Sequence, residues 1–271
     1  MIKGILRKTL FETWALHLAF GIALFVVGML LTMLLPQLEK GLNQFLTTLP
    51  FVRTFIQALL GNDFGGNINA ETLRAIVWVH PTVLTLLWAH EIVYCTRLPA
   101  GEIDRGTIDV LLSWPISRRR LYVSESIVWL VAGAWLCGML FAGYWTAGVF
   151  APSQGDRSLR MPLVVIGNLY CVYFAIGGVA LMVSALSNVR GRAMATVFGL
   201  LLASFLLNFL IQFLPEIEFL SPLGVLSYYR PASILATGKV PWADMLTLMG
   251  IGFVGWIAGL EAFSRRNIST L

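Results

Sequence analysis

Long uncharged runs of apolar residues alternate with polar segments along the chain. Four runs of at least 22 residues contain no Asp, Glu, Lys or Arg, and two runs of 16 residues end at Glu91 and Glu261. A spanning helix needs about 20 residues, so the shorter runs suffice if each glutamate lies about one turn inside the interface, partly hydrated or paired. The pattern predicts six membrane-spanning helices, at about 14–35, 75–94, 126–150, 161–186, 193–214 and 245–263.

Composition supports the same fold class. Of the 271 residues, 58% are apolar and 12% are charged, and the mean hydropathy is +0.79. A soluble domain typically has about 25% charged residues, so an ordinary soluble globule is excluded, and the apolar content excludes a disordered chain. We expect an all-α integral membrane protein in which residues 1–271 form a single transmembrane domain, since six spans leave no room for a separate catalytic domain.

The distribution of basic residues predicts the orientation. With the N-terminus inside, the density of Lys and Arg is more than twice as high in the inner segments as in the outer ones. Lys and Arg favour the cytoplasmic side, so we expect a multi-pass protein of the plasma (inner) membrane with both termini cytoplasmic. The net charge of +5 comes from these membrane flanks, so membrane lipid is the expected contact and no nucleic-acid partner is expected.

Two outer segments are too structured to be simple linkers. Apolar residues recur at three- and four-residue steps over residues 37–60, which predicts an amphipathic helix along the outer membrane surface. Residues 215–244 contain four prolines between apolar stretches too short to span. They predict a folded outer cap or a partly re-entrant segment.

The largest inner segment, residues 94–125, contains an amphipathic pattern. Apolar residues and one threonine fall on one face of a predicted helix from Glu102 to Trp114, while Arg105 and Asp109 are four apart and can pair. Pro115 ends this helix and Ser117 can cap the next one. Periodicity alone leaves two interpretations open: an interfacial helix resting on lipid, or a short lever that docks into a partner.

The same segment resembles the region after the second span of ABC-2 type transporter permeases. The shared pattern is an acidic residue, Arg-Gly-Thr, a Leu pair and Pro-x-Ser-Arg. Its members here are Glu102, Asp104, Arg105, Gly106, Thr107, Leu111, Leu112, Pro115, Ser117 and Arg118. The long loop before the second span, the stretch LSPLGVLSYYRPASIL and the six-span layout are also similar to the family.

The resemblance implies the permease subunit of an ATP-driven ABC exporter. It implies that residues 102–114 are a cytoplasmic coupling helix seated on a separate ATPase, and that residues 3–13 are an amphipathic elbow helix along the inner leaflet. It further implies two copies of the ABC ATPase subunit, which bind ATP and Mg, and a second permease that completes a homo- or heterodimer. The chain itself contains no G-x-x-x-x-G-K-[ST] loop, so we expect no catalytic residue and no cofactor in it.

Polar side chains inside the predicted spans are candidates for transport chemistry. They are Glu91, Glu261, His80, Asn168, Asn208 and Gln212. Intramembrane carboxylates mark proton and ion pathways, so a proton- or ion-coupled secondary carrier using Glu91 and Glu261 is the alternative function, and a membrane scaffold is a third.

Structural explanations compete with these roles. Arg265 lies four residues after Glu261 and can pair with it, and His80 precedes Pro81, where a helix kink explains a polar residue. His90 and Glu91 lack the second histidine of H-E-x-x-H, so no metal site is expected.

Small residues at four-residue steps occur in two spans. One stripe contains Ala134, Gly138, Ala142 and Thr146, and the other is the pair Gly255 and Gly259. Such stripes let helices approach closely, either within one subunit or at a dimer seam.

The missing phosphate-binding loop gives a first testable prediction. The purified chain alone should hydrolyse no ATP, because nothing in it can hold the phosphates. A phosphate-release assay on the detergent-solubilised subunit checks this. Hydrolysis that persists after contaminating ATPases have been removed would contradict it.

Overall fold

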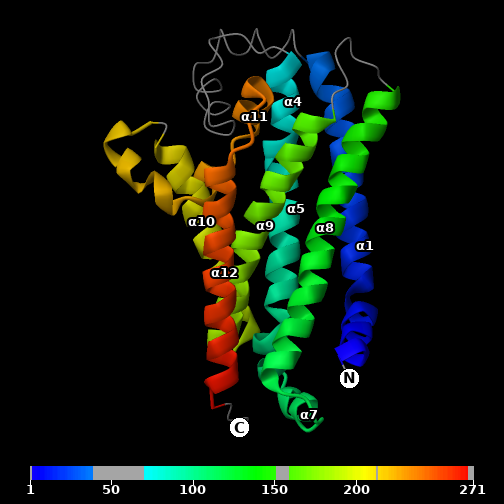
Figure 1. The fold of residues 1–271 in the computed structure, drawn as a ribbon, viewed down its shortest axis with the longest axis vertical. Helices are drawn as coiled ribbons and strands as arrows, with labels where there is room; N and C mark the ends of the chain where they lie inside the picture. The colour runs from blue at the N-terminus through cyan, green and yellow to red at the C-terminus, as the bar shows by residue number, and fades with distance from the viewer. Residues whose placement is uncertain (1, 39–69, 151–158, 212, 268–271) are drawn as a thin grey trace.

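Helices account for every long element in the computed structural model, which describes residues 2–38, 70–150, 159–211 and 213–267 (Figure 1). The long helices are α1 (Ile2–Leu34), α4 (Ala70–Val79), α5 (Pro81–Cys95), α8 (Arg118–Phe150), α9 (Arg160–Leu186), α10 (Arg190–Ile211) and α12 (Trp242–Arg265). Six of the described segments are long and apolar enough to span a membrane, with α4 and α5 together supplying the second. The six predicted spans are confirmed.

Several helices continue beyond the uncharged runs that identified them. Helices α1 and α8 each contain 33 residues, because their basic first turns remain helical outside the apolar stretch. Residues 3–13 are therefore the first turns of α1, and a separate elbow helix is not confirmed. Within these turns Ile5 is buried in the core, whereas Phe11 is 78% exposed, so only part of the expected lipid-facing stripe faces outward.

The long helices lie side by side in one elongated bundle (Figure 1). Helix α1 packs along α8, and α9 packs along α12, while α5 lies between these pairs. Both ends of the described chain lie at one end of the bundle together with α7 (Ile108–Leu112), and we call this the termini end. Helices α4 and α11 (Pro231–Thr237) lie at the opposite end.

Short helical segments at the opposite end fold back onto the bundle. They are η1 (Leu35–Leu38), η3 (Pro215–Leu223), η4 (Val225–Tyr228) and α11. The Val225 amide donates to the Ser204 hydroxyl at 2.9 Å, and the Tyr229 hydroxyl donates to the Trp78 carbonyl at 3.1 Å. These contacts hold this part of the chain against α10 and α4 as a folded cap. The amphipathic helix predicted for residues 37–60 lies almost entirely outside the described residues.

His80 divides the second span as its sequence context predicted. It has a non-helical backbone (φ −56°, ψ 131°), and its Nδ1 accepts a hydrogen bond from the Thr82 amide at 3.3 Å. Pro81 occupies the first turn of α5, where its missing N–H leaves no unsatisfied donor. The role of His80 is that of a helix cap at a break.

Glycines allow the two closest helix pairs to meet at backbone distance. A Cβ on Gly178 of α9 would collide with the carbonyl of Gly252 on α12, and one on Gly143 of α8 would collide with the carbonyl of Phe25 on α1. A Cβ on Gly255 would lie 2.9 Å from the Gly178 carbonyl carbon, and Gly259 packs against Met182. The Gly255 and Gly259 pair therefore packs within the subunit.

The other small-residue stripe faces outward. Ala134 and Gly138 are exposed on α8, and Ala142 and Thr146 are half-buried. A Cβ on Gly138 would meet no atom within 4 Å. This stripe consequently makes no close helix contact at Gly138 within the described part of the subunit.

These glycine contacts generate a stability prediction. Gly178→Ala should destabilise the fold by about 1–3 kcal/mol, because α9 and α12 must move apart to admit a methyl group. Gly138→Ala is the matched control and should be neutral or slightly stabilising, since alanine is the better helix former. Thermal unfolding in detergent compares the two. Equal midpoints would show that the close approach does not contribute to stability.

Candidate functional site

The segment between α5 and α8 forms a compact projection at the termini end. It consists of η2 (Arg97–Gly101), α6 (Glu102–Asp104) and α7, and we call residues 102–114 the coupling segment. The continuous helix predicted over 102–114 is wrong, because the chain turns at Gly106, whose φ is +69°. Apolar residues at three- and four-residue steps do not indicate where a helix is interrupted. The glycine of the Arg-Gly-Thr sequence does indicate a possible turn, because glycine readily adopts a positive φ.

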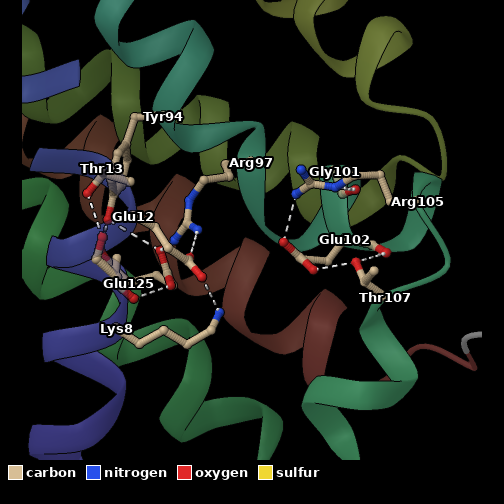
Figure 2. A network of polar contacts seen from close by, with 11 residues as sticks. Lys8, Glu12, Thr13, Tyr94, Arg97, Gly101, Glu102, Arg105, Thr107 and Glu125 are labelled. Carbon is tan, nitrogen blue, oxygen red and sulfur yellow. Dashed lines mark hydrogen bonds and ion pairs between the residues drawn. The ribbon is translucent and has the colours of Figure 1, made fainter. Parts of the chain in front are cut away.

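The acidic–Arg-Gly-Thr pattern closes on itself around this turn (Figure 2). Glu102 accepts from Arg105 Nη2 at 2.7 Å through one carboxylate oxygen and from the Thr107 hydroxyl at 2.5 Å through the other. Arg105 Nε also donates to the Gly101 carbonyl at 3.1 Å. Arg105 thus pairs with Glu102, three residues before it. The pattern first recognised in the sequence is a set of side chains that fix the shape of one turn.

Further hydrogen bonds attach the coupling segment to α9 and α10. Asp104 accepts from the Arg190 amide at 3.2 Å at the start of α10, and Arg190 Nη2 donates to the Val93 carbonyl at 2.9 Å. The Ala100 amide donates to the Ser184 hydroxyl of α9 at 3.2 Å. The segment is therefore held against two spans that follow it in the chain.

Apolar residues of the segment divide between the core and the surface. Ile108 is fully buried, and Leu111 and Leu112 are half-buried against the core. Val110 and Trp114 are 64% and 53% exposed, and we call these two residues the exposed tip. A buried base with an apolar tip suits contact with a second surface.

The last part of the pattern anchors the start of α8. The Ser117 hydroxyl accepts from the Arg120 amide at 3.3 Å, so the predicted cap is confirmed, and Pro115 lies in the bend before it. Arg118 donates to the Arg266 carbonyl just beyond α12. These contacts join the beginning of α8 to the end of α12.

A network of charged side chains lies beside the coupling segment, and the sequence analysis missed it (Figure 2). Arg97 of η2 contacts Glu12 of α1 at 2.7 Å and Glu125 of α8 at 2.6 Å. Glu125 also accepts from the Thr9 hydroxyl at 2.6 Å, and the Tyr94 hydroxyl lies 3.0 Å from the Glu125 carbonyl. The sequence did contain one indication of this network, because Arg97 and Glu125 directly flank the ends of two predicted spans.

Arg97 stays charged in this network. Burial lowers the pKa of its guanidinium, but Glu125, Tyr94 and Glu12 together raise it by more, so the net result is a raised pKa. The Arg97 side chain is 14% exposed and that of Glu125 is 7% exposed, so the pair is largely shielded from water.

The two carboxylates proposed for a carrier lie in different surroundings. Glu91 is completely buried beside Trp129 and Gly177, and no described residue forms an ion pair or a well-formed hydrogen bond with its carboxylate, so the expected pairing is not found there. Glu261 is 36% exposed and pairs with Arg119 at 2.7 Å and with Arg265 at 2.8 Å, which confirms the predicted pairing. Glu261 therefore has a structural explanation, and Glu91 has none.

The remaining polar candidates are dispersed over the bundle. Asn168 donates to the Tyr228 carbonyl at 3.3 Å and so binds the cap, and Asn208 is half-buried on α10. Gln212 lies outside the described residues.

A buried pair of histidines was also missed by the sequence analysis. His17 Nδ1 lies 2.9 Å from His90 Nε2, and the Tyr173 hydroxyl lies 3.3 Å from His90 Nδ1. Among the described residues no group of three or more His, Cys, Asp and Glu side chains could hold a metal ion. Residues 73 positions apart leave no local pattern that would reveal such a pair.

The fold and this site define a multi-pass helical membrane protein with a structured segment between its second and third spans. The sequence profile of the ABC-2 family transporter proteins matches residues 91–268, which include this segment and the last four spans. The chain belongs to the ABC-2 family, and it is a transporter permease without an ATPase motif of its own. A comparison with curated proteins found no match.

The turn at Gly106 yields a prediction about local stability. Gly106→Ala should open the turn, since a left-handed conformation costs a residue with a Cβ about 1–2 kcal/mol. Hydrogen exchange of residues 102–112 should become faster. Gly191→Ala on α10 is the control, because its added Cβ meets nothing within 4 Å and its backbone is helical. Unchanged exchange in the Gly106 variant would show that the left-handed turn is not required.

Proposed function

We propose that this chain is the permease subunit of an ATP-driven exporter and that its coupling segment docks onto a separate ABC ATPase. Family membership supports the class, and the exposed tip supports the docking. Two ATPase copies bind ATP and Mg, and a second permease, identical or different, completes the assembly.

The observation that carries the docking proposal is the exposure of Val110 and Trp114. Tryptophan is enriched among the residues that dominate protein interfaces, and here it projects from a segment whose base is held by hydrogen bonds. A tip presented on a preformed support loses little conformational freedom on binding.

The basic residues at the termini end of the bundle indicate how the protein is oriented in the membrane. The termini end holds the coupling segment together with Arg118, Arg119, Arg265 and Arg266. Since basic residues favour the cytoplasmic side, we assign this end to the cytoplasm of the plasma membrane, where ATP is available.

The carrier alternative finds support at one residue only. Glu91 is a buried carboxyl without an ion pair to a described residue, and an intramembrane carboxyl is a candidate proton site. Glu261 is committed to two arginines at the surface. The ATP-driven mechanism accounts for the coupling segment, which a carrier does not need.

Purification from native membranes in mild detergent tests the proposal. With and without a trapped ATP analogue, mass spectrometry should find an ATPase with a phosphate-binding loop at about one copy per permease. Absence of any ATPase under all nucleotide conditions would overturn the proposal. Glu91 would then be tested as a proton site by Glu91→Gln.

Removal of the exposed tip should weaken this association. Trp114→Ala combined with Val110→Asp should lower ATPase recovery by about tenfold or more, as loss of an interface anchor does. Phe253→Ala is the matched control, because it removes an exposed aromatic side chain from α12. Recovery that equals the control would place the docking surface elsewhere.

A further inference from the structure

We propose that Arg97 is a positioning residue that transmits movement of the coupling segment to α1 and α8. This inference rests on the proposed function, because the movement originates in the ATPase. It adds one specific connection, in which a single guanidinium joins the coupling segment to two helices.

Arg97 holds both helices with separate nitrogens. Its Nη1 donates to Glu12 of α1 at 2.7 Å, and its Nη2 donates to Glu125 of α8 at 2.6 Å (Figure 2). The planar guanidinium fixes the angle between these two bonds, which a lysine ammonium does not. Displacement of Arg97 therefore acts on α1 and α8 together.

The connection from Arg97 to the coupling segment is short and enclosed. Leu98, Ala100 and Gly101 are buried, and the Gly101 amide donates to the Thr96 carbonyl at 3.1 Å. Arg105 and Thr107 then hold Glu102 on the next turn. A buried, hydrogen-bonded segment of this length moves as one piece, so a push on the exposed tip reaches Arg97.

The two branches of the Arg97 contact differ in exposure to water. A crevice lined by Ile5, Lys8, Leu111 and Trp114 lies between α1 and the coupling segment. The Arg97 contact to Glu125 is shielded from water, whereas Glu12 is 39% exposed and also pairs with Lys8 at 2.9 Å. The connection to α8 is thus the stronger of the two, since exposed ion pairs contribute little.

A second connection runs in parallel to α10 and allows a discriminating test. Asp104 holds the first amide of α10 and does not contact the Arg97 network in the described structure. Loss of the Arg97 connection should reduce the responses of α1 and α8, with the larger loss at α1 because residues 115–117 still join α8 to the coupling segment. The response of α10 should stay intact. A general loss of folding or of ATPase binding would silence all three helices.

The experiment uses the permease with its ATPase in lipid nanodiscs. Environment-sensitive fluorophores are placed on exposed positions by Ile22→Cys in α1, Val131→Cys in α8 and Phe198→Cys in α10, one per sample. The native Cys95, Cys137 and Cys171 are buried, so they compete little for the label. Each reporter is read before and after incubation with ATP and orthovanadate, which traps ADP and vanadate in the ATPase after hydrolysis.

Arg97→Gln combined with Glu125→Gln removes the contact without leaving a buried unpaired charge. In this variant the signal from α1 should fall at least about fivefold, the lower end of typical coupling between sites. The signal from α8 should fall less, because α8 remains joined to the coupling segment through residues 115–117. The signal from α10, ATPase recovery and ATP hydrolysis should persist. Arg265→Gln, which removes an arginine from a more exposed ion pair, is the control and should preserve all three signals.

Two results would overturn the inference. One is a full α1 and α8 response in the double variant with the ATPase bound, and the other is equal loss at α10. If the double variant fails to fold, Glu12→Gln tests the weaker branch alone, and it should reduce the α1 signal by a smaller but measurable amount. An unchanged α1 signal would overturn the contribution of this branch. Absence of an ATPase from the unaltered protein would instead overturn the proposed function.

Discussion

Pairing of charges at the membrane edge organises the termini end of this protein. Arg97 is shielded from water between Glu12 and Glu125, and Glu261 is held by Arg119 and Arg265. A shielded charge is costly unless an opposite charge neutralises it, so the Arg97–Glu125 pair fixes the position of η2 against α8. The more exposed pairs of Glu12 and Glu261 add less, and the coupling segment is built beside the most buried pair.

Within the apolar part of the bundle, close packing of the helices, rather than ion pairing, holds them together. Gly143 and Gly178 let backbones of neighbouring helices touch, and the break at His80 adapts the second span to its neighbours. Lipid offers no hydrophobic driving force between helices, so this shape complementarity carries much of their association. Close packing therefore positions the helices along the middle of the bundle.

Local features of the fold were predictable from the sequence, and long-range features were not. Uncharged runs located all six spans. The four-residue spacing of Glu261 and Arg265 correctly predicted their ion pair, and the His80-Pro81 sequence correctly predicted the break in the second span. The prediction of one continuous helix over 102–114 was wrong, because the periodicity of apolar residues gives no indication of the positive φ of Gly106. Arg97 and Glu12 are 85 residues apart, and only tertiary packing brings such residues together.

The self-contained turn from Glu102 to Thr107 has a consequence for partner choice. Its hydrogen bonds are internal to the permease, so its shape does not depend on Val110 or Trp114. The exposed tip can change by mutation while the turn beneath it keeps its geometry. The exposed surface and its support are thus encoded by separate residues, so substitutions at the tip can alter the surface it presents without redesign of the support.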